Sequence, residues 1–286
     1  MHDTITVGID GSAASVNAAA WAAREARRRG LGLHVVHVDD IGPGRRTGLP
    51  ELDAPAGRVR DTLNRARRTL TYGNPGLQIV SSSLMGPPAP ALVNAARDSA
   101  ALVVGSQGCS ALGGLLVGSV ALAVTAEAPC PVVLVASPRP RRHVTRRTGG
   151  GPAEPVIAGI DLDHSCDEVL SQAFAAAELR EAPLIVVHVW SLPLMADTSS
   201  GIPEPESTKQ VQLAAVVGPW LKKYPGTPVT ERLVHGTAGR VLRQAGERAR
   251  LLVVGRRINE DGRLGGTLHS VIHHVTACPV IVIPHD

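Results

Sequence analysis

The sequence predicts an α/β protein made of two tandem, doubly wound units, each with a parallel sheet of five strands. Three observations predict this class. Strand-like and helix-like segments alternate along the chain, several apolar runs are short and continuous, and the whole pattern occurs twice. Continuous apolar runs indicate strands buried on both faces, and strand–helix alternation with right-handed connections produces a parallel sheet covered by helices.

The repeat is found by comparing the chain with itself. The apolar run that ends at Asp10 recurs before Asp161, 151 residues later. The recurring blocks are residues 5–10 and 157–161, 33–38 and 184–189, 102–105 and 252–255, and 130–133 and 278–281. The blocks keep their order with small changes of spacing, so we predict two domains, residues 1–137 and 156–286.

Residues 138–155 join the two predicted domains. This stretch is rich in Pro, Gly, Arg and Thr and lacks hydrophobic periodicity, so we interpret it as a flexible basic linker. Its arginines contribute to the net charge of +4. No recognised nucleic-acid motif accompanies the basic run, so we expect no nucleic acid as a partner.

In the first copy, the apolar residues 4–9 are expected to form the first strand. A helix follows over residues 13–29, capped by Ser12 or Ser15 and ended by Gly30. The remaining segments are a strand at 33–38, a helix at 55–71 after a Gly- and Pro-rich connection, a strand at 77–83, a helix at 89–98, a strand at 101–104, a helix at 119–127 and a last strand at 131–135. Ligands of such sheets bind beyond the carboxyl ends of the strands, where the strand order switches.

The composition is that of a globular protein with aliphatic cores, since 44% of the residues are hydrophobic and only 2% are aromatic. The four cysteines, at 109, 130, 166 and 278, lack CxxC spacing and are too few for a disulfide framework in 286 residues. The N-terminus has no signal-peptide pattern, and no apolar run reaches the ~18 residues of a membrane span. We therefore expect a cytoplasmic protein with no membrane partner.

A glycine-rich loop follows the strand that ends at Val104. Gly105 and Gly108 are followed, after nine residues, by Gly118 and Ser119 at the start of a helix. The first two glycines would allow positive φ and a close backbone approach, so that consecutive N–H groups point at one anion. The helix N-terminus and the Ser119 hydroxyl add donors. The pattern indicates a phosphate-binding loop, but not a P-loop, because no lysine lies in it.

Together these features resemble the universal stress protein (UspA) family. The resemblance rests on the G-x-x-G-(nine residues)-G-[S/T] loop, on Asp10 after the first strand and on His37-Val38 at the end of the second. It covers both copies and leaves out the linker. It implies a Rossmann-like, five-stranded parallel sheet of order 3-2-1-4-5 in each copy. It also implies that ATP, with or without Mg²⁺, binds beside the first and fourth strands.

The resemblance implies roles for single residues of the first copy. Ile9 and Asp10 would lie at the nucleoside, with Asp10 near the ribose, and the backbone of Val38 would contact the adenine. The ribose and the phosphates would be lined by Val104, Gly105, Gly108, Gly118, Ser119 and Val120. Asp10 has a second interpretation, as an aspartate that caps the turn before Gly11-Ser12.

The second copy departs from this pattern. Ile258 occupies the position of the second glycine, and only seven residues separate it from Gly266-Thr267. A β-branched side chain disfavours positive φ and adds bulk where a phosphate would lie. Either Arg256 and Arg257 pair directly with phosphate, or the site is degenerate and kept for folding and pairing. The candidate residues of this second site are Asp161, Val189, Val254, Gly255, Gly266 and Thr267.

Histidines on the last predicted helix have a spacing that is compatible with zinc. His269 and His273 lie four residues apart, with His274 beside His273. A solvated polar helix face explains the same pattern, and we predict no metal site.

Three further residues have more than one interpretation. Cys109, inside the glycine loop, is either a redox-sensitive thiol or a small loop residue. His37 and His188 end buried strands in both copies, and we interpret them as hydrogen-bonded core or rim histidines rather than bases.

We expect an adenine-nucleotide-binding regulatory protein of the stress response, with no catalytic residue. One alternative is an ATP-using enzyme of the same fold, either a slow ATPase or a phosphotransferase. Another is a structural partner protein with two silent sites. Members of the resembled family pair through their last strand, here residues 131–135 and 279–283. We therefore expect the two copies to pair within one chain and the chain to form a homodimer.

Overall fold

The structure is a computed structural model of the chain. It describes residues 3–39, 54–106, 117–137, 153–190, 206–257, 264–274 and 277–284. The chain divides into two compact units, Met1–Arg141 and Arg142–Asp286, here called unit 1 and unit 2. Most of the predicted linker and the middle of the glycine loop, residues 107–116, lie outside the described residues.

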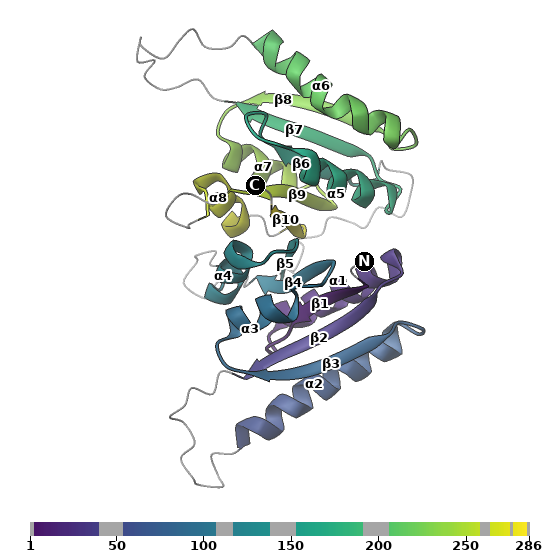
Figure 1. Cartoon of the computed structure of the whole chain (residues 1–286), viewed down its shortest axis with the longest axis vertical. Helices are drawn as coiled ribbons and strands as arrows, with labels where there is room; N and C mark the ends of the chain where they lie inside the picture. Colours follow the sequence, from purple (N-terminus) through teal and green to yellow (C-terminus); the bar gives the residue numbers. More distant parts are fainter. Residues whose placement is uncertain are drawn as a thin grey trace. The chain divides into compact units, whose positions relative to one another are not determined.

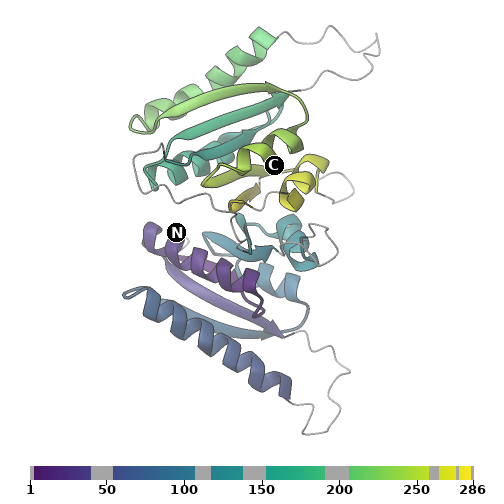
Figure 2. The ribbon, with the colours of Figure 1, turned by 180° about the vertical axis from the view of Figure 1, so that it is seen from behind.

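Unit 1 contains a parallel sheet with helices on both faces (Figure 1). Its elements are β1 (Thr4–Gly8), α1 (Ala13–Arg29), β2 (Gly32–Asp39), α2 (Ala54–Gly73), β3 (Ile79–Met85), α3 (Pro88–Ala95), β4 (Ala101–Ser106), α4 (Ser119–Glu127) and β5 (Val132–Ala136). The strands lie in the order β3-β2-β1-β4-β5, and every neighbouring pair is parallel. Helix α1 packs beside α2 on one face (Figure 2), and α3 packs against α4.

Unit 2 repeats this architecture. Its elements are β6 (Val156–Ile160), α5 (Asp167–Glu178), β7 (Leu184–Trp190), α6 (Glu206–Lys223), β8 (Val229–His235), α7 (Ala238–Gly246), β9 (Leu251–Arg256), α8 (Gly266–His274) and β10 (Val280–Pro284). The order β8-β7-β6-β9-β10 is the same 3-2-1-4-5 arrangement, again with parallel pairs. The predicted fold class is therefore confirmed.

The first helix begins and ends where the local sequence signals place it. Ser12 is the N-cap of α1, and its side chain accepts a hydrogen bond from the backbone N–H of Ser15. Gly30 ends the helix in the left-handed conformation, with φ at 66°, and its N–H bonds back to Ala26 and Arg27. Near this end, the buried Glu25 carboxylate pairs with Arg29 at 2.8 Å.

Several boundaries differ from the predicted ones by one to three residues, as in α3, which ends at Ala95 instead of residue 98. For two strands, pairing explains the difference. The strand expected at residues 77–83 is β3, Ile79–Met85, because its register with β2 extends to the pair Asp39↔Met85. The strand expected at 101–104 continues as β4 to Ser106, which is paired with Ala136 of β5. Strand length is set by the neighbouring strand, which local sequence does not show.

Candidate functional site

The carboxyl edge of the sheet in unit 1 brings most of the predicted site residues together. Strand β1 lies between β2 and β4, so the order of strands switches between β1 and β4. The registers Gly8↔Val36 and Val7↔Val103 fix the strands relative to one another. Ile9 and Asp10 therefore emerge from β1 beside the ends of β2 and β4, which carry the predicted Val38, Val104 and Gly105.

Asp10 caps the turn between β1 and α1. Its Oδ1 accepts a hydrogen bond of 2.9 Å from the backbone N–H of Ser12, and its own N–H donates to the Ser15 hydroxyl at 3.3 Å. Gly11 takes a positive φ of 83° between them. The capping interpretation of Asp10 is thus observed. A carboxylate can accept several hydrogen bonds, so the cap is compatible with the predicted contact to a ribose.

The same turn sets the charge state of Asp10. Burial raises the pKa of this carboxyl, whereas hydrogen bonds from the Ser12 and Ser15 side chains and from the Ser12 backbone lower it. The hydrogen bonds prevail, and the pKa lies below its ordinary value of 3.8. Asp10 is therefore ionised at neutral pH, and both of its carboxylate oxygens can accept hydrogen bonds.

His37 holds the turn from the other side. Its Nδ1 donates a hydrogen bond of 2.7 Å to the carbonyl oxygen of Ile9, and the ring is buried. In unit 2, Nδ1 of the buried His188 donates to the Ile160 carbonyl at 3.2 Å. The interpretation of both histidines as hydrogen-bonded core residues agrees with these contacts. Each histidine ties the second strand of its unit to the turn that carries the aspartate.

Close packing against α1, and not a positive φ, requires glycine at position 105. Gly105 lies in the extended strand β4 and not among the residues with positive φ, so the expectation of positive φ was wrong here. A Cβ at this position would lie 2.6 Å from the carbonyl carbon of Ala14 and 2.7 Å from the nitrogen of Ser15. The first turn of α1 crosses the end of β4 at this point, and a side chain would push it away.

The N-terminus of α4 supplies the donors expected of the glycine loop. Gly118 is the N-cap, and its carbonyl accepts the first helical hydrogen bond, from Leu122. Glycine has no side chain with which to cap the first turn, which begins at Ser119 and Val120, and the described residues show no side-chain cap there. Backbone N–H groups at such an end, together with the helix dipole, favour an anion. The predicted Gly108 and Cys109 lie outside the described residues.

The turn between β1 and α1 also depends on Ser15, whose role at the site was not predicted from the sequence. Ser15 was considered only as a helix cap, yet its hydroxyl accepts from Asp10 and donates to the Ser12 carbonyl at 3.0 Å. The dipeptide Asp10-Gly11 was an available signal, because it is typical of tight turns. The long-range contact of Ala14 with Gly105 had no signal in the sequence.

The equivalent edge of unit 2 is arranged differently around Asp161. Its Oδ2 lies 3.2 Å from Nδ1 of His164 and 3.6 Å from Nη1 of Arg257. The Arg257 side chain, which one of the two interpretations makes a direct partner of phosphate, thus already pairs with a carboxylate. The backbone of Arg257 also accepts a hydrogen bond of 2.9 Å from Gly265 N–H, which closes the base of the shortened loop. Ile258 itself lies outside the described residues.

The helix that follows Asp161 adds negative charge to this edge. Asp167 and Glu168 occupy the first turn of α5, whereas the first turn of α1 in unit 1 contains no acid. Cys166 stands where unit 1 has Ser15, and its Sγ donates to the Asp161 carbonyl at 3.1 Å. Burial, with the nearby acids, raises the pKa of the Cys166 thiol to about 11. The edge is therefore less favourable to a phosphate than its counterpart.

The other predicted residues of unit 2 occupy equivalent positions. Val189 lies near the end of β7, and Val254 and Gly255 near the end of β9. Helix α8 begins with Gly266 and Thr267, and a Cβ added at Gly266 would meet nothing within 4 Å. The elements thus recur, while the charges around them change.

The histidines of α8 do not assemble a metal site from the described residues. The rings of His269 and His273 lie 4.2 Å apart between centroids. In the parts of the chain that the structure describes, no group of three or more His, Cys, Asp or Glu could hold a metal ion.

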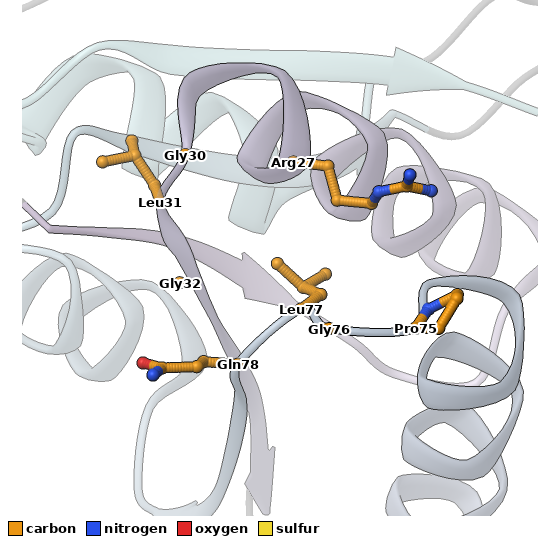
Figure 3. Close-up of a pocket in the computed structure, with 8 residues that line it drawn as sticks. All are labelled: Arg27, Gly30, Leu31, Gly32, Pro75, Gly76, Leu77 and Gln78. Atoms are coloured by element: carbon orange, nitrogen blue, oxygen red, sulfur yellow. The ribbon is translucent and has the colours of Figure 1, made fainter.

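An open hollow lies at the amino ends of strands in unit 1, opposite the carboxyl edge that carries Asp10; Figure 3 shows the residues that line it. Its volume is about 440 Å³, and it precedes β2 and β3 at their amino ends. It is lined by Arg27, Gly30, Leu31, Gly32, Pro75, Gly76, Leu77 and Gln78. The N–H groups of Leu31, Gly32 and Leu77 already bond to backbone carbonyls. The convergence of turns and helix termini at the carboxyl edge, rather than this hollow, identifies the candidate site.

The fold and this edge define a class: tandem doubly wound α/β proteins with an anion-compatible edge where the strand order switches. The chain matches the Universal stress protein family over residues 1–136 and 153–284, and it therefore belongs to that family. A universal stress protein of Mycobacterium tuberculosis strain H37Rv is 30% identical over 302 residues, which cover 97% of this chain and 95% of the relative. The predicted resemblance is confirmed.

The fold is also found among solved structures. A universal stress protein from Archaeoglobus fulgidus DSM 4304 aligns over 100% of both chains with a TM-score of 0.70 and 18% identity, a likeness that shows the fold. Two others, one in complex with cAMP and one from Archaeoglobus fulgidus in complex with dAMP, are 25% identical and have TM-scores of 0.36 and 0.35. They cover 48% and 46% of this chain and 98% of their own. Those two family members bind adenine nucleotides.

None of the described helices is long and apolar enough to cross a membrane.

Proposed function

We propose that the chain binds ATP, with or without Mg²⁺, at the carboxyl edge of unit 1 and acts as a regulatory stress-response protein. One observation carries the proposal: the ends of β1 and β4 and the N-terminus of α4 belong to the same edge, at the switch in strand order. Backbone donors of this kind suit phosphates, and the ionised Asp10 suits a ribose hydroxyl.

In this proposal the residues keep the roles that the family resemblance implies. Asp10 accepts from the ribose, and the backbone of Val38 contacts the adenine. Gly118, Ser119 and Val120 hold the distal phosphates. Gly108, which is assigned from the sequence alone, lines the ribose and the first phosphates. His37 and Ser15 are positioning residues, because they hold the Asp10 turn through hydrogen bonds to Ile9 and Asp10.

We propose one nucleotide per chain. Unit 2 places two acids in the first turn of α5 and pairs Asp161 with Arg257, so a polyphosphate would meet added negative charge and an arginine already engaged. Unit 1 has neither feature in its described residues. The binding is regulatory rather than catalytic in this proposal, and the relatives reported above bear the names of stress proteins. We also propose a cytoplasmic location, because the buried thiols of Cys166 and Cys278 suit a reducing compartment.

Two measurements on the purified chain test the proposal. Mass spectrometry of small molecules released on denaturation should detect an adenine nucleotide, and calorimetric titration of nucleotide-free protein with ATP should give a stoichiometry near one. Two equal sites would contradict the assignment of unit 2, and no binding would contradict the proposal. Steady release of ADP with Mg²⁺ would instead support the ATP-using enzyme.

A further inference from the structure

Strand β3 is one of the two terminal strands of the sheet in unit 1. Among the described residues, it pairs only with β2, so the backbone groups on its other side have no strand partner there. Two of its large apolar side chains are solvent-exposed, Val80 by 62% and Met85 by 69%. Strand edges of this kind are sites for pairing with another chain unless charges, prolines or bulges protect them.

The sequence of β3 contains none of these protections and is complementary to itself. It reads Ile79-Val80-Ser81-Ser82-Ser83-Leu84-Met85, with apolar residues at both ends and serines in the middle. If two copies pair antiparallel about Ser82, the facing pairs are Ile79 with Met85, Val80 with Leu84, Ser81 with Ser83, and Ser82 with itself. Every facing pair then joins residues of the same kind.

The equivalent strand of unit 2 shows the contrast. Strand β8 reads Val-Thr-Glu-Arg-Leu-Val-His, so charges stand at its centre. In the same antiparallel arrangement Arg232 would face Arg232 of the other copy, and Glu231 would face Leu233. Like charges directly opposite one another destabilise a pair of strands, and an acid opposite leucine gains nothing. Strands β3 and β8, which occupy equivalent edges of their units, therefore differ in how well they could pair with a copy of themselves.

We propose that the free edge of β3 is the surface through which two copies of this chain associate. The two β3 strands pair antiparallel across a two-fold axis at Ser82, so the interface is isologous. Pairing satisfies the outer backbone groups of both strands and covers Val80 and Met85. Because it uses the edge away from β1 and β4, the surface leaves the candidate nucleotide site open in both copies.

The first experiment compares two charge insertions at equivalent exposed positions in the full chain. Val80→Lys places a charge opposite Leu84 of the other copy, whereas Thr230→Lys makes the matched change on β8. We expect the wild-type chain and Thr230→Lys to show the same concentration-dependent association by analytical ultracentrifugation. Val80→Lys should raise the dissociation constant by about tenfold or more, since losing about 1.4 kcal/mol suffices.

The second experiment tests the proposed register by disulfide cross-linking, in which a covalent dimer is the positive result. In the proposed register Ser82 faces its own copy with Cα atoms about 4.5–5.5 Å apart, a separation that a disulfide spans. Ser82→Cys should therefore form a covalent dimer under mild oxidation. Val80→Cys should not, because two residues at 80 would lie roughly 13 Å apart along the strands. The wild-type chain, oxidised in the same way, is the control for any cross-linking through the native cysteines.

Two results would overturn the proposal. One is a wild-type chain that stays monomeric at every concentration, with no covalent dimer from Ser82→Cys. The other is association that Val80→Lys and Thr230→Lys weaken equally, with equal cross-linking of Ser82→Cys and Val80→Cys.

Discussion

Single residues at the candidate site of unit 1 stabilise the fold and shape the edge at the same time. Asp10 is held by Ser12 and Ser15, and His37 holds the carbonyl that precedes it. These groups face one another only because β1 and β2 are parallel and in register at Gly8↔Val36. The site is therefore preorganised by its backbone turn, which reduces the entropy that a ligand must overcome.

Gly105 gives the sharpest test at this scale. Gly105→Ala places a Cβ 2.6 Å from the α1 backbone, and neither β4 nor the first turn of α1 can move without disturbing the buried strands. We expect the free energy of unfolding of unit 1 to fall by about 1–3 kcal/mol. Chemical denaturation followed by circular dichroism measures it.

The matched control is Gly266→Ala, where a Cβ meets nothing within 4 Å and the residue lies in a helix. It should be neutral or slightly stabilising, because alanine is the better helix former. Equal losses at both positions would mean that contact with α1 is not what requires glycine at 105.

Among the elements, those with strong end signals were predicted best from the sequence. Helix α1 matches residues 13–29 because Ser12 and Gly30 are local caps, and α4 matches 119–127 because Gly118 precedes it. The end of β3 and the end of β4 were missed because their partner strands set them. The reason for Gly105 was missed because the crossing of α1 is a tertiary contact.

The second prediction concerns Gly108, in the loop between β4 and α4, and its effect on the affinity for ATP. Gly108 lies outside the described residues, and its role is inferred from the G-x-x-G-(nine residues)-G-[S/T] pattern. Gly108→Val would put a β-branched side chain in the phosphate path. We expect the affinity for ATP to fall by about tenfold or more, a loss of about 1.4 kcal/mol, while the circular dichroism spectrum and melting temperature stay unchanged.

Calorimetry of the Gly108→Val chain against the wild type checks this. The matched variant is Ile258→Val, the same residue type at the equivalent position of unit 2, which should leave the affinity unaltered. An unchanged affinity for Gly108→Val would remove the glycine loop from the proposed site.

At the level of the whole molecule, the two units share a fold and differ in charge. The repeat predicted the order 3-2-1-4-5 twice, since both copies carry the same blocks of strands. It did not predict the pairing of Asp161 with Arg257, because that contact depends on side-chain placement beyond the strands. The two units thus share a sheet topology while the charges at their carboxyl edges differ.

The last prediction concerns pairing of the two units through β5 and β10. Each unit ends in an apolar parallel strand, Val132–Ala136 in unit 1 and Val280–Pro284 in unit 2. Within its own unit, each pairs with one strand, β4 or β9. The backbone groups at an unprotected apolar edge can pair with another strand. A linker of the length of residues 138–155 is long enough to let the two units pair.

Expression of residues 1–138 alone tests this pairing, with Val80→Lys included so that the β3 edge cannot contribute. We expect the fragment to self-associate through β5, because its intramolecular partner is missing. Adding residues 153–286 in trans should replace these homodimers by a one-to-one complex in sedimentation velocity. A fragment that stays monomeric at high concentration and ignores the second fragment would mean that the two units fold as independent domains on a linker.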